Sequence, residues 1–500
     1  ATMPDGRTLL GELGELKPDA VYFRAHNLLT SGDGTPALKW GSTGAYGEDG
    51  QGRPIYDWTI VDGIFDAYRE NKVRPYVQIG FMPEALSVKS HPYRHHWTPA
   101  AKYDEIYTGW AYPPKDYEKW AELTHQWTLH CIERYGKEEV AQWYWQTWNE
   151  PNIGYWRGSR DEFFKTHDYA IDAVRRAMPD ARVGGPDVAG GPGGDFLDSF
   201  LKHCLEGENH ATGRRGTPLD FISFHAKGAP KHVNGHVRMG IANQLRDIDA
   251  AFRVIAKYPQ LKDTPLIIGE SDPEGCAACQ GDHLAYRTGT MYSSYTAASF
   301  VRKIDLEPRH GLNLEGALTW AFEFEDQPYF AGFRALATNG IDKPVLNVFR
   351  MMAKLEGARL KVESTGARPL DDILQNGIRK EADVHAVATR SDDRLAIMAG
   401  HFHDDDLPGA SAEVTLDLDG FDAYGKTVRH FRVDESHSNA FTLWLAQGSP
   451  QDPTADQIAE MKSHGGLSEV TPAPVFQSLD KGSRIKLSLP RQAVSLIIME

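Results

Sequence analysis

The 500-residue chain has few cysteines, no excess of basic residues and no long apolar run. Lysine and arginine together number 54, aspartate and glutamate number 69, and the net charge is −15. An acidic surface of this kind disfavours nucleic acid and anionic membranes as partners, and no apolar stretch approaches the length of a membrane span. We therefore expect a soluble globular protein that binds neither. The sequence leaves its compartment, cytoplasmic or periplasmic, and its oligomeric state, monomer or homo-oligomer, open.

Cysteine occurs only four times, at Cys131, Cys204, Cys276 and Cys279. The last two are separated by two alanines, a spacing found in redox sites and in zinc sites. No second cysteine pair and no suitably spaced pair of histidines completes a zinc set. We expect a loop disulfide or two free thiols here, and we expect the protein to need no metal ion and no other cofactor.

Short β-rich runs alternate with helical patterns through about residue 350. The predicted strands are Val21–His26, Arg74–Phe81, Gln142–Glu150, Ala181–Pro186, Leu219–His225, Pro265–Glu270 and Gly316–Phe322. The predicted helices include Trp58–Glu70, Tyr117–Tyr135, Arg160–Ala177, Ile241–Lys257 and His283–Lys303. This alternation predicts parallel βαβ units that close into a (β/α)₈ TIM barrel. Because residues 1–16 resemble a turn and a helix, the first barrel strand is expected upstream of Ala1.

The pattern changes after about residue 355 to short alternating strands separated by glycine, proline, aspartate and serine. These strands are predicted over Val384–Thr389, Leu395–Gly400, Ala412–Leu418, Lys426–Val433, Phe441–Ala446, Arg484–Leu489 and Ala493–Met499. Alternation of this kind is typical of an antiparallel β-sandwich. The sequence therefore predicts a barrel over residues 1–355 and an accessory sandwich domain over residues 356–500.

Residues 146–152, Gln-Thr-Trp-Asn-Glu-Pro-Asn, carry the strongest chemical signal in the chain. An aromatic run, Trp143–Trp145, leads into them and is typical of a buried strand. Pro151 cannot donate to a sheet and disfavours helix in the residue before it, so the strand is expected to end at Glu150. The Glu150 carboxylate is then expected at the C-terminal end of a barrel strand, where the active sites of TIM-barrel enzymes lie. Beside it, the side-chain amide of Asn149 can hydrogen-bond a sugar hydroxyl. The alternative is that Glu150 caps the following helix.

A second glutamate occurs in the same setting, because the apolar run Leu266–Gly269 ends in Glu270. Two carboxylates at the ends of two barrel strands are what glycoside hydrolysis needs. One protonates the leaving oxygen, and the other attacks the anomeric carbon or activates water. A separation of about 5–5.5 Å between them gives retention of configuration and about 6.5–9.5 Å gives inversion. Helix capping is again the alternative for each glutamate.

The two glutamates and four further segments resemble glycoside hydrolase family 39, which contains β-xylosidases and α-L-iduronidases. The four segments are Arg24–Leu29, Arg74–Pro83, Val183–Pro186 and Asp220–His225. The resemblance runs in order from residue 24 to about residue 345. It implies retention of configuration, with Glu150 as the acid/base and Glu270 as the nucleophile, at the ends of the fourth and seventh barrel strands.

The same resemblance implies residues that bind the substrate. His26 and His225 are expected to contact sugar hydroxyls. Trp320 is expected to form the floor of the sugar site, with a place in the core as the alternative. Glu325 lies in an acidic stretch, residues 323–326, where xylosidases have a different pattern, so its role as the substrate-binding acid is open.

One position departs from the xylosidase pattern. Xylosidases of the family usually have a tyrosine two residues after His225, and this chain has Lys227, as in the iduronidases, where the lysine contacts the uronate carboxylate. The alternative is that Lys227 pairs with Glu270 or with a nearby loop acid. Arg334 is a second candidate for a carboxylate partner, at a spacing that fits the iduronidases poorly.

These observations predict an enzyme that acts on small oligosaccharides, a retaining exo-glycosidase that releases terminal β-D-xylosyl residues from xylo-oligosaccharides, as in xylan degradation. An α-L-arabinosidase side activity is compatible with this assignment. An α-L-iduronidase-like uronidase is the first alternative, on the strength of Lys227. A carbohydrate-binding protein without catalytic activity is the alternative from another class.

Overall fold

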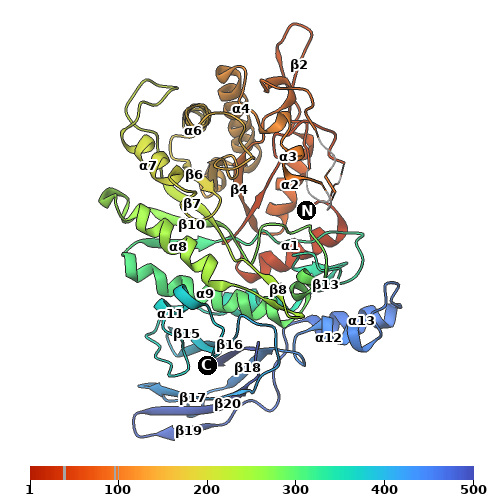
Figure 1. Cartoon of the computed structure of the whole chain (residues 1–500), viewed down its shortest axis with the longest axis vertical. Helices are drawn as coiled ribbons and strands as arrows, with labels where there is room; N and C mark the ends of the chain where they lie inside the picture. The colour runs from red at the N-terminus through yellow and green to blue at the C-terminus, as the bar shows by residue number, and fades with distance from the viewer. Residues whose placement is uncertain (36, 38–40, 95–96, 99–100) are drawn as a thin grey trace. The chain divides into compact units, whose positions relative to one another are not determined.

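The computed structural model describes the chain except residues 36, 38–40, 95–96 and 99–100. The described residues form two units (Figure 1). The first comprises Ala1–Ala226, Asp247–Ser271 and Glu307–Thr319, and the second comprises Lys227–Arg246, Asp272–Leu306 and Trp320–Glu500. The predicted division after residue 355 stays a prediction. In the part of the chain that the structure describes, no helix is both long enough and apolar enough to cross a bilayer.

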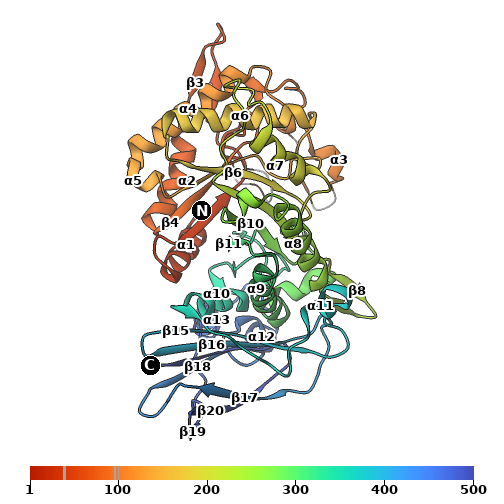
Figure 2. The ribbon, with the colours of Figure 1, turned by 90° about the vertical axis from the view of Figure 1, so that its left-hand side faces the viewer.

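A curled seven-stranded sheet forms the centre of the first unit, in the order β1-β4-β5-β6-β7-β10-β11 (Figure 2). Its strands are β1 (Val21–Ala25), β4 (Val73–Ile79), β5 (Tyr144–Thr147), β6 (Arg182–Val188), β7 (Phe221–Lys227), β10 (Pro265–Asp272) and β11 (Asn313–Ala317). The registered pairs are parallel, for example β4 with β5 and β5 with β6. Parallel pairing brings the carboxyl ends of these strands to one edge of the sheet. The predicted TIM-like architecture is confirmed.

Helices cover the outer side of this sheet (Figure 2). They are α1 (Pro4–Leu16), α2 (Thr59–Glu70), α4 (Tyr117–Tyr135), α6 (Arg160–Ala177) and α7 (Phe196–Glu206). Helix α8 (Ile241–Ile255) is divided between the two units, and most of α9 (Thr290–His310) belongs to the second unit. The α6 helix begins with a capping box, in which Ser159 and Glu162 satisfy each other's backbone N–H groups. The predicted helices over α2, α4, α6 and α8 are confirmed to within two residues.

The strands turn alternate side chains to the two faces of the sheet. On β5, Trp145 points outward and contacts Trp127 of α4, with ring centroids 5.8 Å apart. Tyr144 points inward and packs on Tyr22 and Tyr76, at 5.0 and 5.6 Å. The inward positions further along the strands are polar, which places the hydrogen-bonding groups of the first unit at the carboxyl edge.

The second unit contains two antiparallel sheets. One has the order β14-β15-β16-β21-β18 and the other the order β17-β20-β19. The strands are β14 (Ala358–Arg359), β15 (Asp383–Ser391), β16 (Arg394–Phe402), β17 (Ala412–Asp419), β18 (Val428–Val433), β19 (Phe476–Leu479), β20 (Gly482–Leu489) and β21 (Val494–Met499). Ile397 and Ile497 belong to the core between the sheets, whereas Met398 and Leu496 pack with residues of α9 and of α10 (Pro344–Ala353). The predicted C-terminal antiparallel sheets are confirmed.

Three sequence expectations were wrong in detail. Residues Phe441–Ala446, predicted as a strand, lie in helix α12 (Ala440–Ala446), because the Asn439 side chain accepts from the backbone N–H groups at the helix start. The predicted helix over His283–Lys303 is divided at Gly289 into a 3-10 helix (Asp282–Thr288) and α9. The predicted strand Gly316–Phe322 begins and ends earlier, as β11.

The remaining elements are short. They are β2 (Tyr46–Glu48), β3 (Pro54–Tyr56), α3 (Tyr103–Ile106), α5 (Lys137–Val140), β8 (Lys231–Val233), β9 (His236–Arg238), β12 (Ala337–Thr338), β13 (Ile341–Asp342), α11 (Leu370–Asn376) and α13 (Ala455–Gly465), with 3-10 turns at Glu84–Leu86, Gly109–Ala111 and Pro259–Leu261.

Candidate active site

Glu150 follows the carboxyl end of β5 in a tight turn. The strand ends at Thr147, three residues earlier than predicted. Trp148 and Glu150 have φ values of 75° and 46°, in the left-handed region. The Trp148 N–H donates to the Ile79 carbonyl, and the Glu150 N–H donates to the Asp187 carbonyl, each at 3.0 Å. The backbone thus ties the turn to the two neighbouring strands and fixes where the Glu150 side chain begins.

Glu270 lies within β10 and is 6% exposed. Gly269, the residue before it, has no room for a side chain, because a Cβ there would lie 2.0 Å from Oδ1 of Asp187. The glycine in the apolar run before Glu270 therefore lets a neighbouring carboxylate approach the strand.

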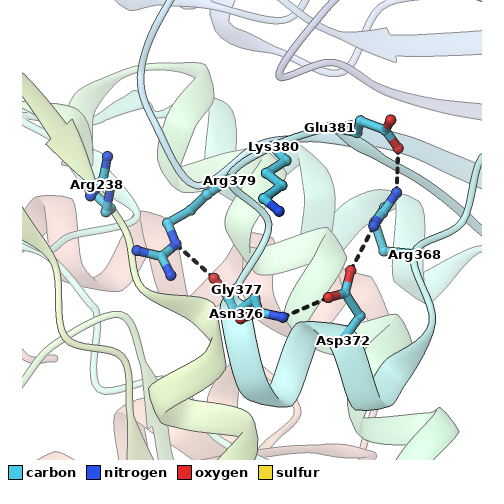
Figure 3. Close-up of a pocket in the computed structure, with 8 residues that line it drawn as sticks. All are labelled: Arg238, Arg368, Asp372, Asn376, Gly377, Arg379, Lys380 and Glu381. Carbon is cyan, nitrogen blue, oxygen red and sulfur yellow. Dashed lines mark hydrogen bonds and ion pairs between the residues drawn. The ribbon is translucent and has the colours of Figure 1, made fainter.

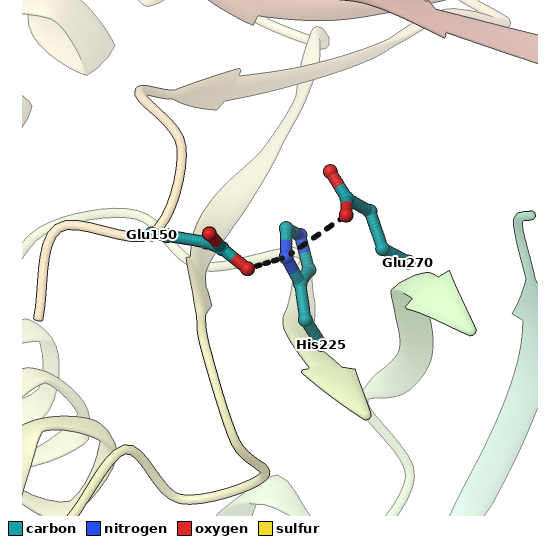
Figure 4. A group of neighbouring side chains, drawn as sticks. All are labelled: Glu150, His225 and Glu270. Carbon is teal, nitrogen blue, oxygen red and sulfur yellow. Dashed lines mark hydrogen bonds and ion pairs between the residues drawn. The ribbon is translucent and has the colours of Figure 1, made fainter. Parts of the chain in front are cut away.

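The two glutamates lie on either side of His225 (Figure 4). His225 Nδ1 is 2.9 Å from Oε1 of Glu150 and 3.7 Å from Oε2 of Glu270. One oxygen of each glutamate and one nitrogen of His225 all lie within 4.8 Å of one another. The nearest oxygens of the two glutamates are therefore no more than 4.8 Å apart.

Arg24, on β1, and His26, the residue after this strand, contact the same oxygen of Glu270. Oε1 of Glu270 is 3.3 Å from Nη1 of Arg24 and 3.2 Å from Nε2 of His26. The other ring nitrogen of His26 bonds to Gln78. Burial lowers the pKa of His26 despite the hydrogen bond to Glu270. Because its pKa is lowered, His26 is a weaker source of positive charge at Glu270 than Arg24 is.

Asn149 is held by the same arginine. Arg24 Nη2 donates to Oδ1 of Asn149 at 3.0 Å, and the Asn149 side chain is almost fully buried. With its oxygen engaged in this way, the amide NH₂ of Asn149 is the group left to donate to a substrate hydroxyl.

The pKa of His225 is strongly perturbed. Burial by itself lowers the pKa of His225, but the charge of Glu270 and the hydrogen bonds to Asp187 and Glu150 outweigh it and raise the pKa to about 9. Burial likewise opposes ionisation of Asp187, but Arg24 and His225 hold its pKa below the ordinary value. The cluster is thus a mixture of buried charges of both signs.

The second unit contains the other predicted residues, Lys227, Trp320 and Glu325. Nζ of Lys227 lies 2.6 Å from Oδ2 of Asp272, which is fully buried. The Trp320 N–H donates to Oδ1 of the same carboxylate at 2.9 Å. Lys227 therefore pairs with an acid two residues after Glu270 in the sequence, as the alternative to substrate binding expects.

Arg334 completes this second group. Its Nη2 lies 3.4 Å from Oδ2 of Asp272, its Nε donates to the Trp320 carbonyl at 3.1 Å, and its Nη1 pairs with Glu274 at 2.6 Å. The guanidinium also lies over the half-buried Trp320 ring, 5.9 Å from the centroid. Glu325 is half-buried, and its predicted role as a substrate-binding acid stays a prediction.

Sequence reasoning missed Arg24 and Asp187 as members of the site. Arg24 has the same inward orientation on β1 as His26, two residues later. Asp187 is the second-last residue of β6 and follows Pro186, whereas Glu150 was identified by a proline after the carboxylate, so the signal used for Glu150 does not detect Asp187.

We assign no metal ion to these residues. Glu150, His225 and Glu270 are close enough to share a cation, but their mutual hydrogen bond and the contacts of Arg24 and His26 already account for their arrangement. The other candidate, the cysteine pair, is a disulfide between Cys276 and Cys279. Cys131 and Cys204 are buried thiols.

A separate pocket of about 250 Å³ lies in the second unit (Figure 3). It is lined by Arg238, Arg368, Asp372, Asn376, Gly377, Arg379, Lys380 and Glu381. Its two acids, Asp372 and Glu381, both pair with Arg368. Both carboxylates are engaged by the same guanidinium, so the pocket lacks the paired free acids of a glycosidase centre.

The model of the Glycosyl hydrolases family 39 matches residues 23–476 of the chain. The protein belongs to this family. It is therefore a glycosidase with a carbohydrate substrate, and the resemblance inferred from the sequence motifs is confirmed.

Relatives of this family-39 protein include two kinds of enzyme. It is 26% identical to the beta-xylosidase of Caldicellulosiruptor saccharolyticus over 419 residues, 80% of this chain and 75% of the relative. It is 26% identical to the alpha-L-iduronidase of Homo sapiens over 478 residues, 89% of this chain and 66% of the relative.

Solved structures show the same fold. The monomeric beta-xylosidase from Caulobacter crescentus CB15 superposes with a TM-score of 0.75 at 20% identity, covering 100% of this chain and 93% of that one. A bacterial orthologue of human α-L-iduronidase gives 0.74 at 18% identity, covering 99% and 78%.

Proposed function

We propose that the protein is a retaining exo-β-D-xylosidase that removes terminal xylosyl residues from xylo-oligosaccharides, with Glu150 as the acid/base and Glu270 as the nucleophile. The observation that carries this proposal is the short separation of the two carboxylates, whose nearest described oxygens lie within 4.8 Å. The short gap between these oxygens supports direct attack by one carboxylate over activation of an intervening water, which goes with a separation of about 6.5–9.5 Å between the carboxyl groups.

In the first step Glu270 attacks the anomeric carbon while Glu150 gives its proton to the departing glycosidic oxygen. The bond from carbon to the leaving oxygen breaks as the bond from carbon to Oε of Glu270 forms. Arg24 and His26 both contact Oε1 of Glu270, so they keep the nucleophile ionised and oriented before attack.

In the second step the deprotonated Glu150 removes a proton from water, which attacks the same carbon and releases Glu270. Two inversions give net retention. Asn149, beside the acid/base in the sequence, donates its amide hydrogens to a sugar hydroxyl in this proposal. His26 and His225 each have both ring nitrogens facing protein side chains, so their expected contacts with sugar hydroxyls stay predictions.

The state of Lys227 supports a neutral sugar. A uronate requires a cation available for its carboxylate, and Lys227 is instead paired with buried Asp272 at 2.6 Å. The β-xylosidase of Caldicellulosiruptor saccharolyticus, of which the match covers 75%, is consistent with xylose.

One observation favours a uronidase as the second candidate. Arg334 and Lys227 both contact Asp272, so two cations face one carboxylate. A uronate could compete with Asp272 for this pair, and the match to human α-L-iduronidase is of similar identity.

A panel of aryl glycosides tests the proposal. We expect nitrophenyl β-D-xyloside to be hydrolysed faster than the matching α-L-arabinoside and β-D-glucoside, and far faster than a fluorogenic α-L-iduronide. Faster cleavage of the iduronide than of the xyloside overturns the xylosidase assignment, and no cleavage of any glycoside overturns the catalytic roles.

Lys227→Met separates the two candidates further. In a xylosidase the change affects all substrates of the panel alike, because it disturbs only the surroundings of Asp272. In a uronidase it removes a charge-assisted contact worth about 1.5–3 kcal/mol, roughly ten- to a hundred-fold, and only from uronides. The matched control is Lys119→Met, which breaks a lysine pair with Glu48 at 2.8 Å elsewhere and should leave the ranking of substrates unchanged.

A further inference from the structure

Asp187 is a buried carboxylate at the catalytic cluster that the proposed mechanism does not use. It lies near the end of β6, it is fully buried, and its φ of 50° is left-handed. Its two oxygens face two different cations. Oδ2 is 3.3 Å from Nη2 of Arg24, and Oδ1 is 3.4 Å from Nε2 of His225.

The imidazole of His225 therefore has a carboxylate at each nitrogen. Nδ1 meets Glu150 at 2.9 Å and Nε2 meets Asp187 at 3.4 Å. Asp187 has no path to the substrate in this arrangement, because its oxygens are directed at His225 and Arg24. Since an ionised carboxylate only accepts hydrogen bonds, Asp187 keeps a hydrogen on Nε2. Nδ1 is then the nitrogen that can gain or lose a proton toward Glu150.

We propose that Asp187 is a positioning residue that orients His225 and, through its negative charge, retains one proton shared between His225 Nδ1 and Glu150. This inference rests on the proposed role of Glu150 as the acid. The shared proton is the one that Glu150 delivers to the glycosidic oxygen.

The protons balance across the two steps. Before the reaction the pair of Glu150 and His225 holds one proton between Oε1 and Nδ1. When the glycosidic bond breaks, that proton leaves with the departing oxygen, and the pair becomes a carboxylate beside a neutral imidazole that keeps its hydrogen on Nε2, which faces Asp187 at 3.4 Å. In the second step the proton released by the attacking water restores the pair.

Other charges around the pair act in known directions. Among the described residues, Glu270 faces His225 at 3.7 Å, Arg24 and His26 contact Glu270, and Tyr76 interacts with Asp187. Arg24 opposes retention of the proton and Glu270 favours it. Tyr76 stays neutral because burial raises its pKa well above the ordinary value, and burial lowers the pKa of His26. Replacing Asp187 removes a negative charge near the pair without changing either of the proposed catalytic glutamates.

The test is Asp187→Asn, measured as the pH dependence of kcat/KM on an aryl glycoside that the wild-type enzyme hydrolyses. Asparagine has the same shape and tolerates the left-handed backbone, so the change removes charge with little strain. A charge at this distance shifts a neighbour's proton affinity by about 1–3 pH units. We expect the basic limb of the profile to move to lower pH by at least about one unit, with activity recovering as the pH falls.

A structural role would give a different result, namely loss of activity by the same factor at every pH. That outcome, or an unmoved basic limb, overturns the inference. The shift should also be absent when Asp187→Asn is combined with Glu150→Gln and assayed on a dinitrophenyl glycoside, which needs no acid. Persistence of the shift in the double variant likewise overturns it.

Asp168→Asn is the matched control. Asp168 is also fully buried and pairs with a histidine, His203, at 3.0 Å in the same unit, but it does not contact either glutamate among its described interactions. This variant should lose stability and keep the wild-type pH limits.

One further readout keeps the inference testable if Asp187→Asn does not fold. Nitrogen NMR of ¹⁵N-histidine-labelled wild-type protein should show Nε2 of His225 protonated across the active pH range, and an Nδ1–H tautomer with bare Nε2 overturns the inference. Failure of the proposed function can be distinguished from failure of this inference. If Glu150 is not the acid, the Glu150→Gln variant keeps the basic limb of the pH profile, whether or not Asp187 is replaced.

Discussion

Arg24→Met is the substitution whose effect follows most directly from the geometry of the cluster. The Arg24 side chain is 3% exposed, and its guanidinium lies 3.3 Å from an oxygen of Glu270 and 3.3 Å from an oxygen of Asp187. Methionine fills a similar volume without charge. The change therefore leaves two buried carboxylates without the cation that lies between them.

The magnitude can be worked from these distances. At 3.3 Å and an effective dielectric constant of about 20, each pair has a Coulomb energy of about 5 kcal/mol before desolvation is counted. Removing one partner of a buried pair typically costs about 3–5 kcal/mol. Loss of the cation also makes it easier to protonate Glu270, by about 1–3 pH units.

The assay is kcat/KM against pH on an activated aryl glycoside. We expect the acid limb of Arg24→Met to move to higher pH by about 1–3 units, because a nucleophile that has taken up a proton cannot attack. Near the wild-type optimum the loss should be about ten- to a thousand-fold. The urea midpoint should fall as well.

Arg74→Met serves as the control. Arg74 makes a two-pronged contact with Glu139 at 3.0 and 3.1 Å in the same unit, away from the two glutamates. It should lower stability and leave the acid limb in place. An Arg24→Met enzyme whose acid limb coincides with that of the wild type would refute the role given to Arg24.

Three further results are expected. Glu150→Ala should lose about 10²–10⁴-fold on alkyl glycosides and much less on dinitrophenyl glycosides in steady-state and burst kinetics, and equal losses would contradict its role as the acid. Folding raises the pKa of His225 from 6.5 to about 9, which contributes about 3 kcal/mol to the free energy of unfolding. This contribution is fully present below pH 6.5 and is lost as the pH rises through about 9. The free energies of unfolding of wild type and His225→Gln in urea should therefore converge over that window, and a difference that stays constant would count against this account. Gly269→Ala places a Cβ 2.0 Å from Oδ1 of Asp187 and should move the basic limb in the same direction as Asp187→Asn, whereas a wild-type pH profile would show that the carboxylate position is unimportant.

The sequence predicted the barrel strands well because each is an apolar run with a clear end. The local pattern of apolar residues is enough to predict such strands. It failed at Phe441–Ala446, where β-prone residues are overruled by the Asn439 cap and by packing of Phe441 and Trp444 on Phe330. Contacts of that kind join residues more than a hundred positions apart, so no local pattern contains them.

The candidate site shows the same limit. Glu150 and Glu270 could be named from their position after apolar runs. Their separation could not, because it depends on the register of strands far apart in the chain. For Lys227 the sequence left open a uronate contact or a pair with Glu270 or a loop acid, whereas in the structure it pairs with Asp272, the last residue of β10. Asp187 was missed because its importance comes from what it faces, Arg24 and His225.

The central claim is tested most directly by the configuration of the first sugar released. Proton NMR of the early products of an aryl β-D-xyloside resolves the two anomers before they interconvert. Direct attack by Glu270, followed by water activated by Glu150, predicts β-xylose as the initial product, with the α anomer growing in later at the rate of mutarotation. Initial release of α-xylose would contradict the account, and so would the absence of any xylose.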